Sequence, residues 1–488
     1  MKKINLLWIL FLSLHIFPMA QSCLPDGIDF ERQGQIDSFH IDHPGCTVIE
    51  GPMRIQGAEI QNLLGLSGIT SIGGRLLVQA DELTELKGLD SVTTLGGNVD
   101  INFNKNLKNL SGLSHVKTIS GGLRITSNYS LETLGLNSLT SVDGEFSLIG
   151  SISLQMTDLN ALKNIHGDFY FIGSKANNLA GLNHLESIDG NFILSGQQSI
   201  QNLSGLDHLS SIGGNLEISS NGSLQNLTGF PPIESIEGDF SINQNSTLQN
   251  LTGLESIQHV IGKLTIEKNY ALTSLSGLNG LVDVGQLDLF RNDLLLNLTG
   301  LDALTSINGD VEIAYNNTIE NLTGLNSLTI IGNNLTITHN QSLTSLTGPG
   351  QLTSIGGNLN IHFNDELLTC AIMSVCSHIS TGGPYDIGAN ASGCSTANEI
   401  LEKCAVAVNE TGNENGIVLY PNPANDKLVI NGISLDNVSI RMTDTKGAMI
   451  QGWKISGGSI DISSLSAGMY FMSIQSNKQN IVRRIIKS

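Results

Sequence analysis

Few residues in this sequence have the types and spacing of a metal-binding or catalytic site. The one pattern typical of a metal site is His40-Ile41-Asp42-His43, because two histidines three residues apart can share one face of a helix. Pro44 follows at once, and no third ligand stands nearby. We interpret both histidines as solvent-exposed side chains and expect no metal site and no cofactor.

Catalytic motifs are also missing from the sequence. It contains no Gly-x-Ser-x-Gly nucleophile elbow, no Gly-Lys-Ser/Thr phosphate-binding loop and no His-Glu-x-x-His motif. His339 and His362 lie in neighbouring repeats but one position out of register, which argues against a shared role. We therefore predict that the protein is not an enzyme.

The net charge of the chain argues against some classes of binding partner. The 488 residues include 24 Lys and Arg against 44 Asp and Glu, which gives a formal net charge of −20. Such an excess keeps a protein soluble and repels nucleic acids and anionic membrane surfaces. We exclude nucleic acid as a partner.

Residues 1–20 are typical of a secretory signal peptide. Two lysines near the start precede an apolar run from Ile4 to Phe17, and the small residue Ala20 stands before the expected cleavage point. The run is too short for a transmembrane helix, which needs about 20 apolar residues. A lipoprotein cleaved before Cys23 is the alternative, although the usual Leu three positions earlier is absent.

The six cysteines lie only towards the two ends of the chain's long central segment. An even number of cysteines in an exported chain predicts disulfide bonds. The four C-terminal cysteines allow three pairings, of which we favour the simplest. The expected bonds are Cys23–Cys46, Cys370–Cys394 and Cys376–Cys404.

An internal repeat organises the segment between the cysteines. An aliphatic residue before a Gly-rich turn recurs every 23 or 24 residues, and we call this residue the anchor. Two more apolar positions follow four and six residues after the anchor, which is the period of a strand with one buried face. The fourteen anchors are Ile49, Ile72, Leu95, Ile119, Val142, Ile165, Ile188, Ile212, Ile236, Val260, Val284, Ile307, Ile331 and Ile355.

An asparagine stands nine residues after most anchors. Stacked coils bring such residues into a column about 4.8 Å apart, where each amide bonds the backbone of a neighbouring coil. We interpret this column as a structural ladder rather than a ligand site. Its members are Asn104, Asn128, Asn221, Asn245, Asn269, Asn316, Asn340 and Asn364, with Asn292 in a shortened coil.

The repeat predicts an all-β protein: a right-handed parallel β-solenoid of about 14 coils over residues 49–380. Segments 21–48 and 381–404, which hold most of the cysteines, are expected to cap the two open β-edges. In the second cap, Thr396 and Glu399 form a capping-box pair that predicts a helix start.

The string Ser211-Ile212-Gly213-Gly214-Asn215-Leu216-Glu217-Ile218, followed by Asn221, Leu224 and Leu227, resembles the receptor L-domain branch of the leucine-rich repeat superfamily. Its members include the L domains of insulin- and EGF-type receptors and some fungal cell-wall proteins. The resemblance covers about residues 23–404 and implies the solenoid fold. It implies no particular ligand, because that family shares no ligand residue.

Beyond a linker expected at residues 405–416, residues 417–488 show short alternating stretches typical of a small antiparallel β-sandwich. This segment closely resembles the C-terminal sorting domain of the type IX secretion system of Gram-negative bacteria. The resemblance implies the type IX machinery as a partner, passage through the outer membrane, and then release or attachment to lipopolysaccharide. The residues that carry it are Tyr420, Pro421, Asn422, Pro423, Ala424, Gly468 and Tyr470, with a basic C-terminal end.

One irregularity marks a candidate contact surface. In three consecutive coils the Asn ladder lapses to Ser151, Ser174 and Gln197, and outward strand positions become apolar. An exposed apolar patch on a soluble protein often marks a contact surface. The alternative is a rearrangement that draws these residues into the core. The patch residues are Ile149, Tyr170, Ile172 and Ile193.

These features together predict a secreted or cell-surface, non-catalytic binding or adhesion protein without a transmembrane segment. Its ligand would be an extracellular protein or glycan that the sequence does not identify. The alternative is a structural component of a surface layer or matrix with no specific ligand.

Overall fold

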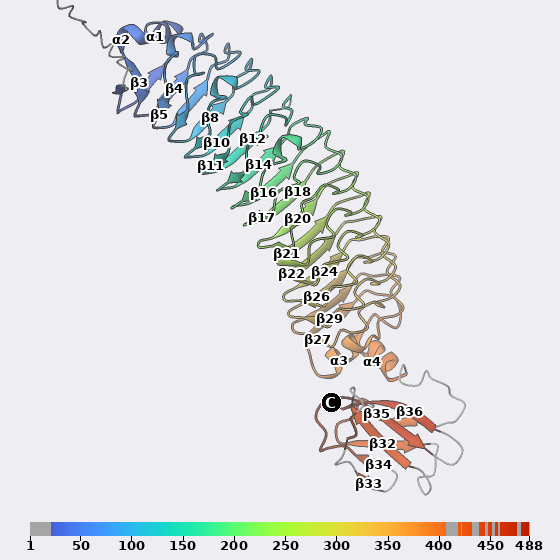
Figure 1. Ribbon diagram of the computed structural model, residues 1–488. Coiled ribbons are helices and arrows are strands. Elements are labelled where there is room, and N and C mark those ends of the chain that lie inside the picture. Colours follow the sequence, from blue (N-terminus) through green and yellow to red (C-terminus); the bar gives the residue numbers. More distant parts are fainter. Residues whose placement is uncertain are drawn as a thin grey trace, which may run out of the picture. The chain divides into compact units, whose positions relative to one another are not determined.

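The structure is a computed structural model that describes residues 21–151, 153–406, 418–420, 422–431, 439–444, 448–450, 454–456, 459–475 and 480–487. It confirms the expected fold class, since a parallel β-solenoid precedes a small antiparallel β-domain (Figure 1). The chain divides into two compact units, residues 1–154 with 158–162 and residues 155–157 with 163–488. The predicted signal peptide, and residues 407–416 of the predicted linker, lie outside the described residues.

In the first unit each coil contributes a short strand that ends at the anchor and a second strand after the Gly-rich turn. Both sets stack in parallel, in the orders β1-β3-β5-β7-β9-β11 and β2-β4-β6-β8-β10-β12. Two 3-10 turns, Leu64–Leu66 and Ser111–Leu113, lie in the loops between coils. The strands are β1 (Gln21–Cys23), β2 (Ile28–Phe30), β3 (Cys46–Ile49), β4 (Met53–Gln56), β5 (Ser71–Ile72), β6 (Leu76–Gln79), β7 (Thr94–Leu95), β8 (Val99–Asn102), β9 (Thr118–Ile119), β10 (Leu123–Thr126), β11 (Ser141–Val142) and β12 (Phe146–Ile149).

The second unit continues the same pattern. Its longer strands stack in the order β14-β16-β18-β20-β21-β22-β24-β26-β28-β29. In β21 and β22 the two strands of a coil are joined into one. The elements are β13 (Asn164–Ile165), β14 (Phe169–Ile172), η3 (Ala180–Leu182), β15 (Ser187–Ile188), β16 (Phe192–Ser195), β17 (Ser211–Ile212), β18 (Leu216–Ser219), β19 (Ser235–Ile236), β20 (Phe240–Asn243), β21 (His259–Glu267), β22 (Asp283–Phe290), β23 (Ser306–Ile307), β24 (Val311–Ala314), β25 (Ile330–Ile331), β26 (Leu335–Thr338), β27 (Ser354–Ile355), β28 (Leu359–His362) and β29 (Tyr385–Gly388).

The predicted asparagine ladder is present, and Asn245 shows how it works. Its Oδ1 accepts the backbone N–H of Asn221 in the preceding coil at 3.0 Å, and its Nδ2 donates to the carbonyl of Ile218 at 2.8 Å. The side chain is fully buried. In the lapsed stretch Gln197 makes the equivalent bonds, to Ser174 N at 3.3 Å and Phe171 O at 2.9 Å. Each amide therefore ties its coil to the preceding one and supplies the acceptor for a buried N–H at the corner.

The N-terminal segment, predicted as a cap, is itself a coil, because β1 and β2 pair in parallel with β3 and β4. Two short helices that sequence reasoning missed, α1 (Gln33–Asp37) and α2 (Phe39–Asp42), follow β2. They bury Ile36 and Phe39 beside Phe30. The disulfide Cys23–Cys46 joins β1 to β3.

The C-terminal segment likewise adds a coil beyond the last anchor. Strand β29 pairs with β28, and Asn390 continues the ladder by accepting the N–H of Asn364 at 3.1 Å. The expected solenoid of about 14 coils is thus extended at its ends by coils that lack the anchor motif. Helices α3 (Met373–Ser380) and α4 (Ala397–Val406) follow β28 and β29 respectively, and α4 extends two residues into the segment predicted as a linker.

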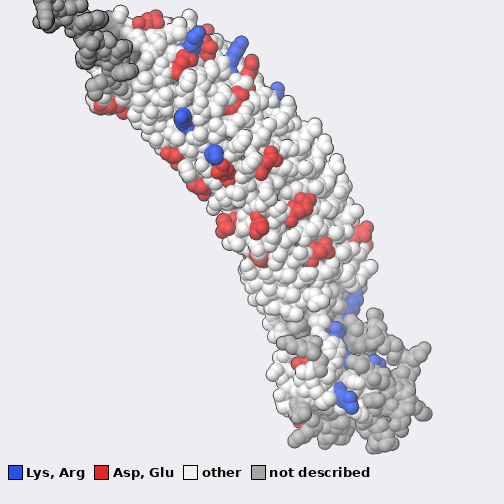
Figure 2. Space-filling view, viewed as in Figure 1, with Lys and Arg blue, Asp and Glu red and all other residues white. Residues whose placement is uncertain are grey.

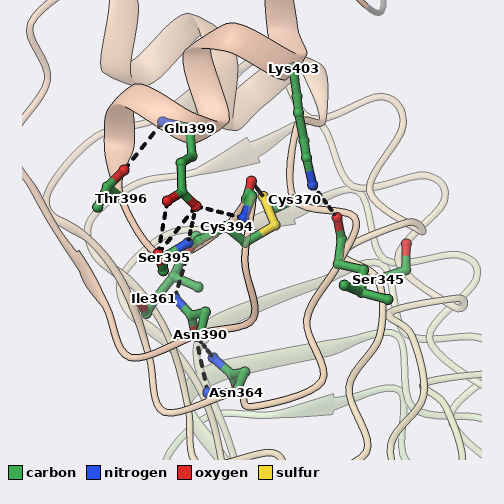
Figure 3. Close-up of a disulfide and its surroundings, with 12 residues drawn as sticks. Ser345, Ile361, Asn364, Cys370, Asn390, Cys394, Ser395, Thr396, Glu399 and Lys403 are labelled. Atoms are coloured by element: carbon green, nitrogen blue, oxygen red, sulfur yellow. Dashed lines mark hydrogen bonds between the residues drawn. A yellow bond between two sulfur atoms is a disulfide. The ribbon is translucent and has the colours of Figure 1, made fainter.

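Figure 3 shows a disulfide and hydrogen bonds that stabilise the C-terminal end of the solenoid. Disulfides Cys370–Cys394 and Cys376–Cys404 tie the loops and helices together. Thr396 Oγ1 accepts the N–H of Glu399 at 3.3 Å, which is the expected helix cap. The reciprocal bond of a capping box is absent, however, because the Glu399 carboxylate reaches back to the N–H groups of Gly393 at 2.6 Å and Ser395 at 3.2 Å.

The tail forms two antiparallel sheets around one apolar core, as the sequence predicted. The sheets have the strand orders β30-β31-β34-β33 and β32-β35-β36. Core residues come from both sheets, among them Leu428, Ile460, Met442 and Met472. The strands are β30 (Val418–Tyr420), β31 (Lys427–Asn431), β32 (Ser439–Asp444), β33 (Lys454–Ser456), β34 (Ser459–Asp461), β35 (Gly468–Gln475) and β36 (Asn480–Lys487).

The ladder predicts a clear difference between two asparagines of one coil. Asn245→Ala leaves the buried Asn221 N–H without its acceptor and removes a bond to the Ile218 carbonyl, so we expect a loss of about 3 kcal/mol of stability. Asn243→Ala removes only a bond to the Ser241 hydroxyl and should change stability by less than about 0.5 kcal/mol. Thermal unfolding measures both, and equal melting temperatures for the two variants would contradict the ladder's role.

Candidate functional site

The predicted contact patch is half-buried. On adjoining strands β14 and β16, Tyr170 pairs in register with Ile193, while the flanking Phe169 and Phe171 point inward and are fully buried. Ile172 and Ile149 are also half-buried. The four patch residues therefore belong neither to the core nor to the most exposed apolar side chains of the chain. Whether the patch contacts a partner stays a prediction.

A hydrogen-bond network at the neighbouring turn holds Tyr170. Its hydroxyl donates to Asp168 Oδ2 at 2.9 Å, and Asp168 Oδ1 accepts the backbone N–H of Asn191 at 2.7 Å. The bond from that N–H is the main reason that the pKa of Asp168 lies below its ordinary value. Burial opposes this effect, and the Tyr170 hydroxyl and the Asn191 amide add to it.

A row of stacked rings lies elsewhere, at the corner that follows the longer strands, and its last ring, Phe363, is exposed. We define the corner column as Arg291, Tyr315, His339 and Phe363, each of which immediately precedes a ladder asparagine. All four residues have φ between 54° and 58°. The Tyr315 and His339 rings stack with centroids 4.4 Å apart, those of His339 and Phe363 with 4.6 Å, and the Arg291 guanidinium lies 5.4 Å from the Tyr315 centroid. Sequence reasoning missed this column because it aligned the anchors and the asparagines but not the position between them.

The structure places both histidines of the N-terminal cap near one aromatic ring. The Phe39 ring lies 5.8 Å from His40 and 5.3 Å from His43, centroid to centroid. Within the described residues, no three His, Cys, Asp or Glu side chains gather in a way that could hold a metal ion. On the face shown in Figure 2, acidic and basic side chains are scattered over the solenoid, and large areas carry neither.

The sorting-motif residues meet at one edge of the tail. Asn422 donates from Nδ2 to the Arg484 carbonyl at 2.8 Å and accepts the N–H of Ile486 at 2.8 Å, both on the last strand, β36. Ala424 is fully buried, and its N–H donates to the Ile486 carbonyl at 2.8 Å. The opening motif is therefore bonded to the basic C-terminal end, and the two sequence signals form one structure.

The other motif residues have structural roles where the structure describes them. The Tyr470 hydroxyl donates to the carbonyl of Ser466 at 2.8 Å, and Gly468 has a φ of 156° that favours glycine. Pro423 follows a cis peptide bond. Pro421 and the side chain of Tyr420 lie outside the described residues.

Comparison with known families identifies the tail. Residues 418–488 match the family described as the secretion system C-terminal sorting domain. This is a type IX sorting domain, so the protein is secreted or displayed on the surface of a Bacteroidetes-type bacterium, and the tail interacts with the type IX machinery. No curated protein matches the chain. None of the helices in the described ranges has the length and hydrophobicity of a transmembrane segment.

The Asp168 network predicts a pH effect. Because the folded-state pKa of Asp168 is lowered, its contribution to stability is complete above the ordinary value of about 3.9 and is lost as pH falls through the folded value. Asp168→Asn keeps an acceptor oxygen, as Asn191 does for the N–H of Asn215, but does not titrate. We expect its melting temperature to fall less between pH 5 and pH 3 than that of the unmodified protein. Asp143→Asn, at an exposed site, should not reduce this fall, and a reduction equal to that of Asp168→Asn would contradict the assignment.

The bonds of Asn422 predict an export defect. Asn422→Ala leaves the Ile486 N–H and the Arg484 carbonyl without partners and should destabilise the tail by about 2 kcal/mol. We expect less protein at the cell surface and more in the periplasm, measured by antibody labelling of intact cells against total protein. The exposed neighbour Asn425→Ala serves as the control and should export normally. Normal surface levels of the Asn422 variant would show that this link is dispensable.

Proposed function

We propose that the protein is a non-catalytic binding or adhesion protein that its tail delivers to the bacterial surface. The observation that carries the proposal is the sorting domain at residues 418–488, joined in one chain to a disulfide-stapled solenoid. Such a solenoid stacks coil on coil and presents the same outward positions many times over, which gives an extended surface for contact.

Two features of the solenoid support binding rather than packing alone. Exposed rings such as Phe363, which is 50% exposed, and half-buried outward side chains such as Tyr170 are the kinds of residue that anchor interfaces. The resemblance of the repeat to receptor L domains is consistent with a binding role. After export the tail would be removed. The protein would then be attached to lipopolysaccharide at the cell surface or released.

A glycan and protein array probed with the full chain tests the proposal. We expect saturable binding to one ligand class that the free ligand competes away. A complete lack of competable binding across both arrays would refute the binding role and leave a structural component of a surface layer or matrix. A chain carrying Phe103→Leu, a substitution outside the corner column, serves as a folded control.

A further inference from the structure

The corner column contains large planar side chains at positions where glycine would be cheapest. A left-handed backbone costs most residues about 1 kcal/mol or more. At the same position of other coils the chain uses Gly150, Gly173 and Gly196, with φ between 64° and 68°, or polar residues such as Ser220 and Lys268. In four successive coils it instead carries a guanidinium and three rings. Their stacking offsets part of the backbone cost, and of the three rings Phe363 is the exposed one while Tyr315 and His339 are half-buried.

The stack of rings in the corner column ends at Phe363. One face of the Phe363 ring stacks on His339, with an interplanar angle of 27°. The next position of the column is Ala389, which has the same left-handed backbone (φ 51°) but only a methyl group. A methyl group cannot cover an aromatic ring, and Phe363 is 50% exposed. One face of this ring is therefore open.

An imidazole and a carboxylate lie near this ring. His362 contacts the Phe363 ring at 5.7 Å between centroids, and its Nε2 lies 2.8 Å from Asp386 Oδ1. The side chain of Asp386 is 72% exposed, so its carboxylate can accept hydrogen bonds from a ligand. Gly388 keeps the space beside His362 clear, because a Cβ there would lie 3.3 Å from the imidazole.

The loop side of the column is polar in every coil, with Asp293, Asn317, Gln341 and Asp365 standing two residues after its members. The strand side is mixed, with Phe290, Ala314, Thr338 and His362. Successive coils lie at the strand spacing of about 4.8 Å. An open aromatic face beside an imidazole, with carboxylates and amides along one flank, suits a ligand with apolar C–H faces and hydroxyl edges. An anionic polymer would be opposed by Asp386 and by the net charge of −20.

We propose that the corner column binds a neutral polysaccharide, with one sugar ring stacked on the open face of Phe363 and hydrogen-bonded to Asp386. The following sugars lie along the column over His339 and Tyr315. This inference rests on the proposed binding function and names its ligand class and its site.

Affinity gel electrophoresis of the full chain tests the site, with soluble β-glucan, mannan and arabinoxylan as probes and alginate as the anionic comparison. We expect at least one neutral polymer to retard the protein and alginate not to. Phe363→Leu keeps the apolar bulk but removes the flat face, and should weaken binding about five- to tenfold. Phe363→Tyr restores the face and should bind within about twofold of the unmodified protein.

Phe103 provides the matched control. It occupies the same position of its coil with a φ of 59° and is 55% exposed, but it lies outside the corner column, and neither Ala80 before it nor Ser127 after it offers a ring to stack on. Phe103→Leu should bind within about twofold of the unmodified protein. Melting temperatures of all variants check that each one is folded.

This inference would be overturned if Phe363→Leu bound the polymer as well as the unmodified protein does. It would also be overturned if Phe103→Leu lost as much affinity as Phe363→Leu. Either result would leave the wider binding function standing with a different site.

Retardation by alginate alone would overturn the inference too, because it would indicate a charge-driven surface. So would a lack of retardation by every neutral polymer. Only the additional absence of any competable ligand on the arrays would refute the proposed function as well.

Discussion

The solenoid depends on hydrogen bonds from each coil to the next. Strand pairing satisfies the backbone groups of the straight segments, but the corner after each longer strand would leave a buried N–H without a partner. The asparagine side chain fills this gap, as Asn245 does for Asn221, and it adds a bond to the carbonyl of Ile218. Without it, every coil would carry an unsatisfied buried N–H costing about 1–3 kcal/mol. The leucines then bury apolar area, but the asparagines decide where the chain turns.

This dependence makes the stability of the solenoid local. Each coil contacts its neighbours, so the free energy is close to a sum of nearest-neighbour contributions. The ends have a neighbour on one side only, and there the chain adds other supports. Helices α1 and α2 and the Cys23–Cys46 disulfide strengthen one end, and α3, α4 and two disulfides strengthen the other. The cysteines are absent from the middle because the middle has two neighbours per coil.

The features that the sequence predicted are those imposed on every coil. The anchors and the asparagines recur at fixed spacing because each coil must solve the same packing problem, so their roles can be deduced without coordinates. The N-terminal coil was missed because β1 and β2 pair like their neighbours without the anchor motif. The even number of cysteines predicted disulfides, and the simplest C-terminal pairing is the one that the structure has. The corner column escaped notice because its members, from Arg291 to Phe363, share a conformation and not a residue type.

The tail presents a different kind of dependence. Asn422 reaches Arg484 and Ile486, which lie 62 and 64 positions later in the chain. The opening motif therefore reaches its bonded form only after strand β36 has been synthesised and has folded against it. A chain that stops before Arg484 contains the whole opening motif but not the strand that bonds it. The local sequence around Asn422 and the folded tail are thus two different states of the same motif.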